Sequence, residues 1–227
     1  MKRILLILVA GGISMVGAGR ASAQFGNMIP FKRPNIANFF HPVAGAGTQY
    51  EETGKDGRKA HIEVAIVDKE MVGAQQGYWI EFGSDHASGR EIKYIKALIT
   101  PDDFRAHQVV TFMEQNNQLT QIDVDSLPVN YDAFTKDLAK WHQVGSESVT
   151  VPAGTFSCDH WAKDDGTSDI WVSSKVAPMG MVKSVDKNDT TVLVKTFSEA
   201  KTHLTGNPVK LDLQQMKMMN RGMQQHP

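Results

Sequence analysis

The feature that most constrains the fold of this chain is the alternation of apolar and polar residues along short segments that end in turn sequences. In the segment 58–68, every second residue is apolar: Ala60, Ile62, Val64 and Ile66. This period of two is typical of a strand with one buried face. The sequence at 54–57, Gly-Lys-Asp-Gly, predicts a tight turn, which makes 48–53 the hairpin partner of this strand.

Further segments of strand-like composition follow along the chain. They predict strands at 78–82, 92–100, 106–114, 146–151, 155–163, 168–173, 181–186 and 190–200. Short links join the later ones, so neighbours in sequence are expected to pair as an antiparallel meander. The predicted fold class is therefore mainly β (α+β), with a single antiparallel sheet of eight or more strands. So large a twisted sheet tends to curl.

Two segments have a helical period instead, and they predict the helices that would cover the sheet. One is 131–142, with apolar residues at Tyr131, Phe134, Leu138 and Trp141. Asn130 is its expected cap and Gly145 its expected stop. The other is 211–223, with a stripe of Leu213, Met216, Met219 and Met223. We expect this tail helix to pack over the sheet, because four exposed side chains of this kind would each forgo about 1.5–3 kcal/mol of burial.

The first 23 residues have the pattern of a cleavable secretory signal peptide. Lys2 and Arg3 precede a short apolar run, and Ala21-Ser22-Ala23 has the small-x-small form of a cleavage site. Glycines and Arg20 interrupt the run well before the roughly 20 apolar residues that a membrane span needs. The predicted organisation is a signal peptide at 1–23, an irregular lead-in at 24–47, a curled β domain at 48–210 and a helix or tail at 211–227. The predicted location is the periplasm.

Composition excludes several classes of protein. Without the signal peptide the chain has 21 basic and 25 acidic residues, a net charge of −4, and no basic cluster of the kind that nucleic-acid binding requires. No later apolar run is long enough to cross a membrane. The single cysteine, Cys158, excludes an internal disulfide, so packing alone must hold the fold.

No group of residues in the sequence forms a recognisable catalytic or metal site. Ser84, Asp85 and His86 are adjacent in a turn-like segment, whereas the members of a triad meet from separated positions. Cys158 and His160 share a strand face, but a zinc site needs at least three protein ligands. The acidic segment 164–169 lacks the distal glutamate of a calcium loop. The sequence thus predicts no enzyme, no cofactor and no metal.

Two segments support a resemblance to a known family. The stretch 147–161, ESVTVPAGTFSCDHW, and the stretch 169–183, DIWVSSKVAPMGMVK, contain turn-forming Pro-Ala-Gly and Pro-Met-Gly sequences. Over about 143–206 the chain resembles uncharacterised bacterial exported proteins, which are in turn similar to the periplasmic lipoprotein carriers of the LolA/LolB-like superfamily. The resemblance implies a curled antiparallel half-barrel whose concave apolar face is covered by helices and receives acyl chains.

Two functions remain open at this point. The first is a periplasmic protein, not an enzyme, that binds a lipid or a lipoprotein acyl chain on the concave face. Its expected contacts are Phe156, Cys158, His160, Met216, Met219 and Met223. The second is an interaction module of the cell envelope, whose half-barrel is filled by its own side chains and whose partner is a protein. An open apolar groove distinguishes the two.

The signal peptide leads to a direct test. We expect cleavage after Ala23, which gives a mature protein that begins with Gln24. Intact mass and N-terminal sequencing of the protein recovered from the periplasm check this. A periplasmic chain that still begins with Met1 would contradict it.

Overall fold

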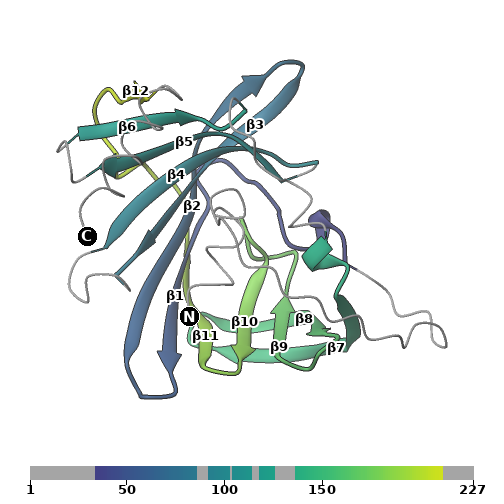
Figure 1. Cartoon of the computed structure of the whole chain (residues 1–227). Coiled ribbons are helices and arrows are strands. Elements are labelled where there is room, and N and C mark those ends of the chain that lie inside the picture. The colour runs from purple at the N-terminus through teal and green to yellow at the C-terminus, as the bar shows by residue number, and fades with distance from the viewer. Residues whose placement is uncertain (1–33, 86–91, 103, 114–117, 126–135, 212–227) are drawn as a thin grey trace, which may run out of the picture.

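The computed structural model describes residues 34–85, 92–102, 104–113, 118–125 and 136–211. Within them, twelve strands form one sheet in the spatial order β12-β6-β5-β4-β3-β2-β1-β11-β10-β9-β8-β7 (Figure 1). Their bounds are β1 Gly47–Gly54, β2 Lys59–Val72, β3 Gln75–Ser84, β4 Lys93–Thr100, β5 Arg105–Met113, β6 Gln118–Asp123, β7 Trp141–Val151, β8 Gly154–Lys163, β9 Ser168–Val172, β10 Met181–Asp186, β11 Asp189–Phe197 and β12 Val209–Leu211. The 3-10 helix η1 (Ile36–Asn38) precedes them.

The predicted curled sheet is confirmed. Its two end strands, β12 and β7, are not neighbours in the order of the described strands, so the sheet curls without closing. All ten predicted strands coincide with observed strands to within a few residues. Two strands were missed: β6 has no regular alternation, and β12 has only three residues.

Register divides the sheet into two faces. Val64 on β2 lies opposite Phe82 on β3, and Phe82 lies opposite Ile95 on β4. Val64 is fully buried, and so is Ile80, two residues before Phe82. We call this side the inner face and the side of Glu63 and its paired residues the outer face. Alternation along the central strands thus sends one row of side chains into the main core, where each contributes about 1.5–3 kcal/mol.

The last five strands in the order curl back on themselves. The turn between β7 and β8 places Ala153 against β11, where its backbone N–H donates to the carbonyl of Leu193 over 3.2 Å. A bulge between Gln143 and Gly145 bends β7. Bulges locally increase the twist of a strand, which allows the hairpin to return to a strand that is not its neighbour in the sheet.

A segment that we call the strap, residues 198–208, joins β11 to β12. β11 lies beside β1, whereas β12 pairs with β6 at the far edge, so the strap crosses β1 to β6. The seven strand spacings between them correspond to about 34 Å at about 4.8 Å each. Eleven linking residues reach at most about 40 Å. The strap is long enough to span this distance, and its backbone bends at Glu199, with a φ of +63°, and at Gly206, with a φ of +112°.

The strap also explains the one exception to the predicted antiparallel pairing. β12 runs parallel to β6, with Val209 opposite Thr120 and Leu211 opposite Ile122. A parallel pair needs a long connection; here the chain from β6 to β12 runs through β7 to β11, and the strap is its last part.

The prediction of a helix over 131–142 is wrong at its end. Residues 126–135 lie outside the described part of the chain; residues 136–138 are helical, and Trp141 and His142 already belong to β7. Trp141 is buried and lies opposite Lys163 on β8. The bulge after Trp141 interrupts the alternation of apolar and polar residues in β7. The apolar residues up to Trp141 therefore had the three-to-four-residue spacing of a helix. Gly145 lies at that bulge rather than at a helix end.

The predicted tail helix cannot be placed. Leu211, its expected first residue, ends β12, and residues 212–227 lie outside the described part of the chain. Covering helices are thus not seen among the described residues.

Ile80 tests the role of the inner face. Replacing the fully buried Ile80 by Ala removes three carbons from the centre of the sheet and should lower the free energy of unfolding by about 2–5 kcal/mol. That loss corresponds to a fall in Tm of roughly 5–15 °C for a domain of this size. Val194→Ala on β11, where the side chain is 39% exposed, is the control and should change Tm little. Equal losses for the two variants would mean that the inner face is not the core.

Candidate functional site

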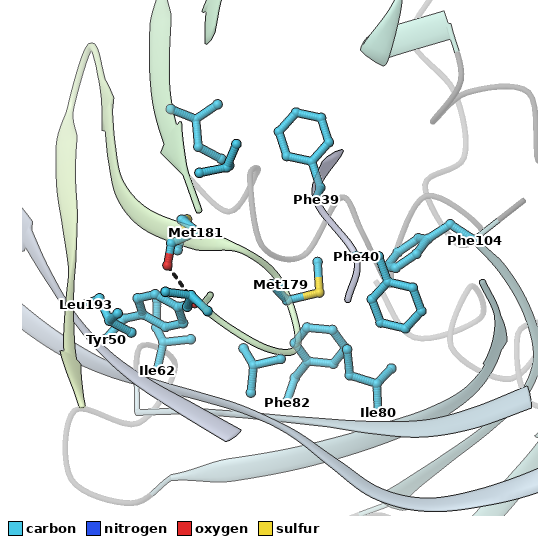
Figure 2. Close-up of a cluster of buried hydrophobic side chains, with 14 of the residues drawn as sticks. Phe39, Phe40, Tyr50, Ile62, Ile80, Phe82, Phe104, Met179, Met181 and Leu193 are labelled. Carbon is cyan, nitrogen blue, oxygen red and sulfur yellow. Dashed lines mark hydrogen bonds between the residues drawn. The ribbon is translucent and has the colours of Figure 1, made fainter. Parts of the chain in front are cut away.

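The inner face of the sheet is covered by side chains that do not belong to strands. Phe39 and Phe40 follow η1, Phe104 lies in the turn before β5, and Met179 lies in the loop before β10 (Figure 2). All four are less than 10% exposed. We call these four residues the aromatic cover.

Ring contacts fix the cover against the sheet and against itself. Phe40 meets Phe104 edge to face, with ring centroids 5.0 Å apart. Phe39 lies 6.1 Å from Trp161 on β8 in a tilted arrangement. Edge-to-face and tilted pairs match the ring quadrupoles and add to the burial energy. The cover is thus a packed layer of the core.

The backbone of the loop 173–180 anchors the cover. His41 N–H donates to the carbonyl of Pro178 over 2.7 Å, which joins the lead-in to this loop. Gly180 has a φ of +68°, and a Cβ there would lie 3.4 Å from the carbonyl oxygen of Phe39. Only glycine adopts this conformation without strain. The Pro-Met-Gly sequence of the resemblance therefore holds the lead-in against the sheet.

A buried tyrosine ties the cover loop to the central strands. The hydroxyl of Tyr50 on β1 donates to the carbonyl of Met181 over 3.1 Å (Figure 2). Burial raises the pKa of Tyr50, so its phenol stays protonated and remains a donor.

The structure brings two of the predicted contact residues into the core. Cys158 is 2% exposed, and Phe156 is half-buried and packs against the same core cluster. Burial, and to a smaller extent the charges of Asp159 and Glu147, raise the pKa of the Cys158 thiol to about 11. The buried thiol expected from the sequence is present.

His160 is not part of the inner face. His160 lies opposite Trp171 on β9, and Trp171 lies opposite Lys183 on β10. The same row of paired residues continues across β11 and β1 to His61 on β2, which is exposed and lies on the outer face. The imidazole stacks on Trp171 at 4.3 Å, and its Nε2 lies 2.8 Å from Asp169. The structure therefore places His160 on the outer face, within a polar surface cluster.

Trp161 is the inner-face residue that sequence reasoning missed. It is fully buried and lies opposite Ile170 on β9. The signal was available in the alternation of β9, where Ser168, Ile170 and Val172 are apolar or small. The polar Asp159, two residues before Trp161, concealed it. Met216, Met219 and Met223 lie outside the described residues.

Most histidines in the described part of the chain pair with carboxylates, and two of them, His160 and His203, each lie within 4 Å of two. Five of the six described histidines have a ring nitrogen 2.7–2.9 Å from an Asp or Glu oxygen: His61, His107, His142, His160 and His203. Asp85, considered above with Ser84 and His86, binds both the backbone N–H and the ring of His61. No group of three potential metal ligands occurs among the described residues.

One of these pairs has the order of a catalytic chain. His107 Nδ1 lies 2.7 Å from Asp125 Oδ2, and its Nε2 lies 3.0 Å from the hydroxyl of Thr100. Thr100 is only 1% exposed, however, so a substrate cannot reach its hydroxyl in this conformation. The arrangement joins β4, β5 and the end of β6, and we assign it a structural role.

The strap is held on the outer face by a buried carboxylate. Glu81 on β3 is 3% exposed and accepts hydrogen bonds from the hydroxyl of Thr202, the backbone N–H of His203 and the ring of His203. The imidazole of His203 stacks on Tyr94 at 3.9 Å. Burial, and then the charges of Glu63 and Glu81, raise the pKa of Tyr94. We call the contacts of Glu81 with Thr202 and His203 the clamp.

Comparison with known proteins adds little to this geometry. No family model matches the chain, and no curated protein matches it. A protein of Parabacteroides distasonis ATCC 8503, provisionally described as a lipoprotein, is 15% identical, with a TM-score of 0.39, over 70% of this chain and 99% of that one. A protein of Bacteroides fragilis NCTC 9343, provisionally described as an exported protein with a YmcC-like fold, is 13% identical, with a TM-score of 0.38, over 71% of this chain and 100% of that one. Similarity this low says nothing about ligands or partners.

Cys158 supplies a test of the packed core. We expect the native protein to react with a thiol reagent at pH 8 at least a hundred times more slowly than the denatured protein, because the thiol is buried and its pKa is raised to about 11. Ellman's reagent with and without guanidinium chloride measures the two rates. Equal rates would show that this part of the core opens freely.

Proposed function

We propose that this protein is an exported scaffold of the cell envelope, not an enzyme, whose half-barrel is filled by its own side chains and whose partner is a protein. The observation that supports this choice is the aromatic cover. Phe39, Phe40, Phe104 and Met179 occupy the inner face where a carrier would hold its ligand.

The energetics of the cover favour a filled interior over a groove. A carrier needs an unfilled cavity of several hundred Å³ lined by apolar groups. Here an acyl chain would have to displace side chains whose burial contributes about 1.5–3 kcal/mol each. It would also have to separate the edge-to-face contact between Phe40 and Phe104. A protein partner at the surface needs neither change.

Export rests on the sequence. The basic start, the short apolar run and the Ala21-Ser22-Ala23 site support secretion, and the periplasm is the proposed location. The part of the chain that the structure describes contains no helix long and apolar enough to cross a membrane.

A second candidate is the lipid carrier, in which the cover is a plug that the ligand displaces. One observation favours it: Nε2 of His41, beside the cover, is buried without a hydrogen-bond partner among the described residues. A buried unpaired nitrogen is unfavourable, and a ligand headgroup would pair with it. Phe156 and Cys158, with Met216, Met219 and Met223 of the tail, remain the proposed contacts of such a ligand.

Ligand retention separates the two candidates. Native mass spectrometry of the protein purified from its own envelope should give the mass of the mature chain alone, and cis-parinaric acid should not bind, because the cover fills the inner face. A retained lipid, or saturable probe binding by the unaltered protein, would favour the carrier.

Variants of the cover give a second measure. Phe39→Ala with Phe40→Ala should lower Tm by roughly 10 °C or more, since each truncation costs about 3–5 kcal/mol in a filled core. Val43→Ala, in the same segment but 55% exposed, is the matched control. A displaceable plug predicts the opposite result, namely a small loss of Tm together with tighter probe binding.

A further inference from the structure

The edge of β6 is occupied by β12. Its described residues, Val209–Leu211, make the one parallel pairing among the described strands. Val209 is 50% exposed although it lies within the pair, and Lys210 is exposed as well. Parallel pairs are slightly less stable than antiparallel ones, and these exposed side chains add little burial energy to the pair.

The residue paired with Val209 has an unsatisfied hydroxyl group. Thr120 on β6 is 1% exposed, and its hydroxyl has no hydrogen-bond partner among the described residues. Register places Val209 directly opposite it. An isopropyl side chain cannot pair with a hydroxyl, whereas Ser, Thr or Asn opposite a threonine can.

A local polar contact keeps β12 in place. The clamp fixes the strap at Thr202 and His203, several residues before β12 begins. Leu204, next in the strap, packs on the outer-face cluster of Trp79, Leu98 and Val110. The strap and its clamp thus hold β12 beside β6, and the side chains of β12 contribute little to this contact.

We propose that β12 is an intramolecular stand-in for a partner, and that the edge of β6 binds an extended polypeptide segment of another protein once the strap is released. Backbone hydrogen bonds to the edge supply the affinity, as in other cases of strand addition. Two features of the edge define the segment. It has an apolar residue opposite Ile122, where Leu211 now lies, and a hydroxyl or amide side chain opposite Thr120.

This inference rests on the proposed function in one respect, namely that the partner is a protein. The stand-in role itself concerns β6, β12 and the strap, none of which contains a residue of the aromatic cover. A retained lipid would therefore contradict the proposed scaffold function. The role of β12 would still be decided by the hydrogen-exchange experiment below.

The first experiment compares two full-length variants by hydrogen-exchange mass spectrometry. Val209→Thr provides a partner for the hydroxyl of Thr120, whereas Lys210→Thr, one residue later, points to the opposite face. We expect Val209→Thr to slow exchange in 209–211 and β6 at least fivefold and Lys210→Thr to leave it unchanged. Equal exchange in both variants would overturn the assigned mismatch.

The second experiment measures binding at the edge. The probe is a fluorescent peptide with the sequence of residues 199–211, tested by anisotropy against the unaltered protein and the clamp variant Thr202→Ala with His203→Ala. We expect at least tenfold tighter binding by the clamp variant, and tighter binding of the peptide with Thr at 209 than of the peptide with Thr at 210. Equal affinity for both proteins, or for both peptides, would contradict the proposal. If the clamp variant does not fold, the exchange comparison alone decides.

Discussion

Burial of one face of a single curled sheet is the constraint on which the rest of this structure depends. Strands β1 to β4 send Tyr50, Val64, Ile80 and Ala97 to the inner face, and all are at most 1% exposed. A single sheet cannot bury this row by itself and needs a second layer. Here the second layer comes from curling, from the returning β7–β8 hairpin and from the aromatic cover, because no disulfide is present to hold a looser arrangement.

The outer face follows from the same topology. A chain that leaves β11 and pairs with the free edge of β6 must cross six strands, and the strap does so in eleven residues. The strap converts part of an exposed face into a covered one, and it buries Glu81 as a consequence. A buried carboxylate is costly unless it is hydrogen-bonded, and three donors from the strap meet that need.

The inner face and the edge of β6 therefore differ in what they can bind. The inner face is filled by residues of the chain itself, anchored through Gly180 and His41. At the edge of β6, the hydroxyl of the buried Thr120 has no hydrogen-bond partner among the described residues. A surface whose polar groups are all paired gains no hydrogen bond when a partner binds it. A surface with an unpaired buried hydroxyl does, so a partner strand that supplies the missing hydrogen bond would bind it more tightly than β12 does.

Local sequence determined the elements that obey a local rule. The alternation at 58–68 and the turn at 54–57 sufficed for the β1–β2 hairpin, and the short turns after 151 sufficed for the later meander. The burial of Cys158 also followed from its strand pattern. These features depend on residues within about ten positions of each other, so their physical cause is present in a single segment.

Tertiary structure decided what depends on distant residues. β6 and β12 became strands through pairing across the sheet, and Trp141 joined β7 because Lys163 and a bulge lie beside it. His160 faces outward and Trp161 inward because register is set by β9 and not by the composition of β8. Of the candidate site, the sequence predicted the irregular lead-in but not the contacts of its phenylalanines, since only the curl of the sheet brings Phe40 to Phe104 and Thr202 to Glu81.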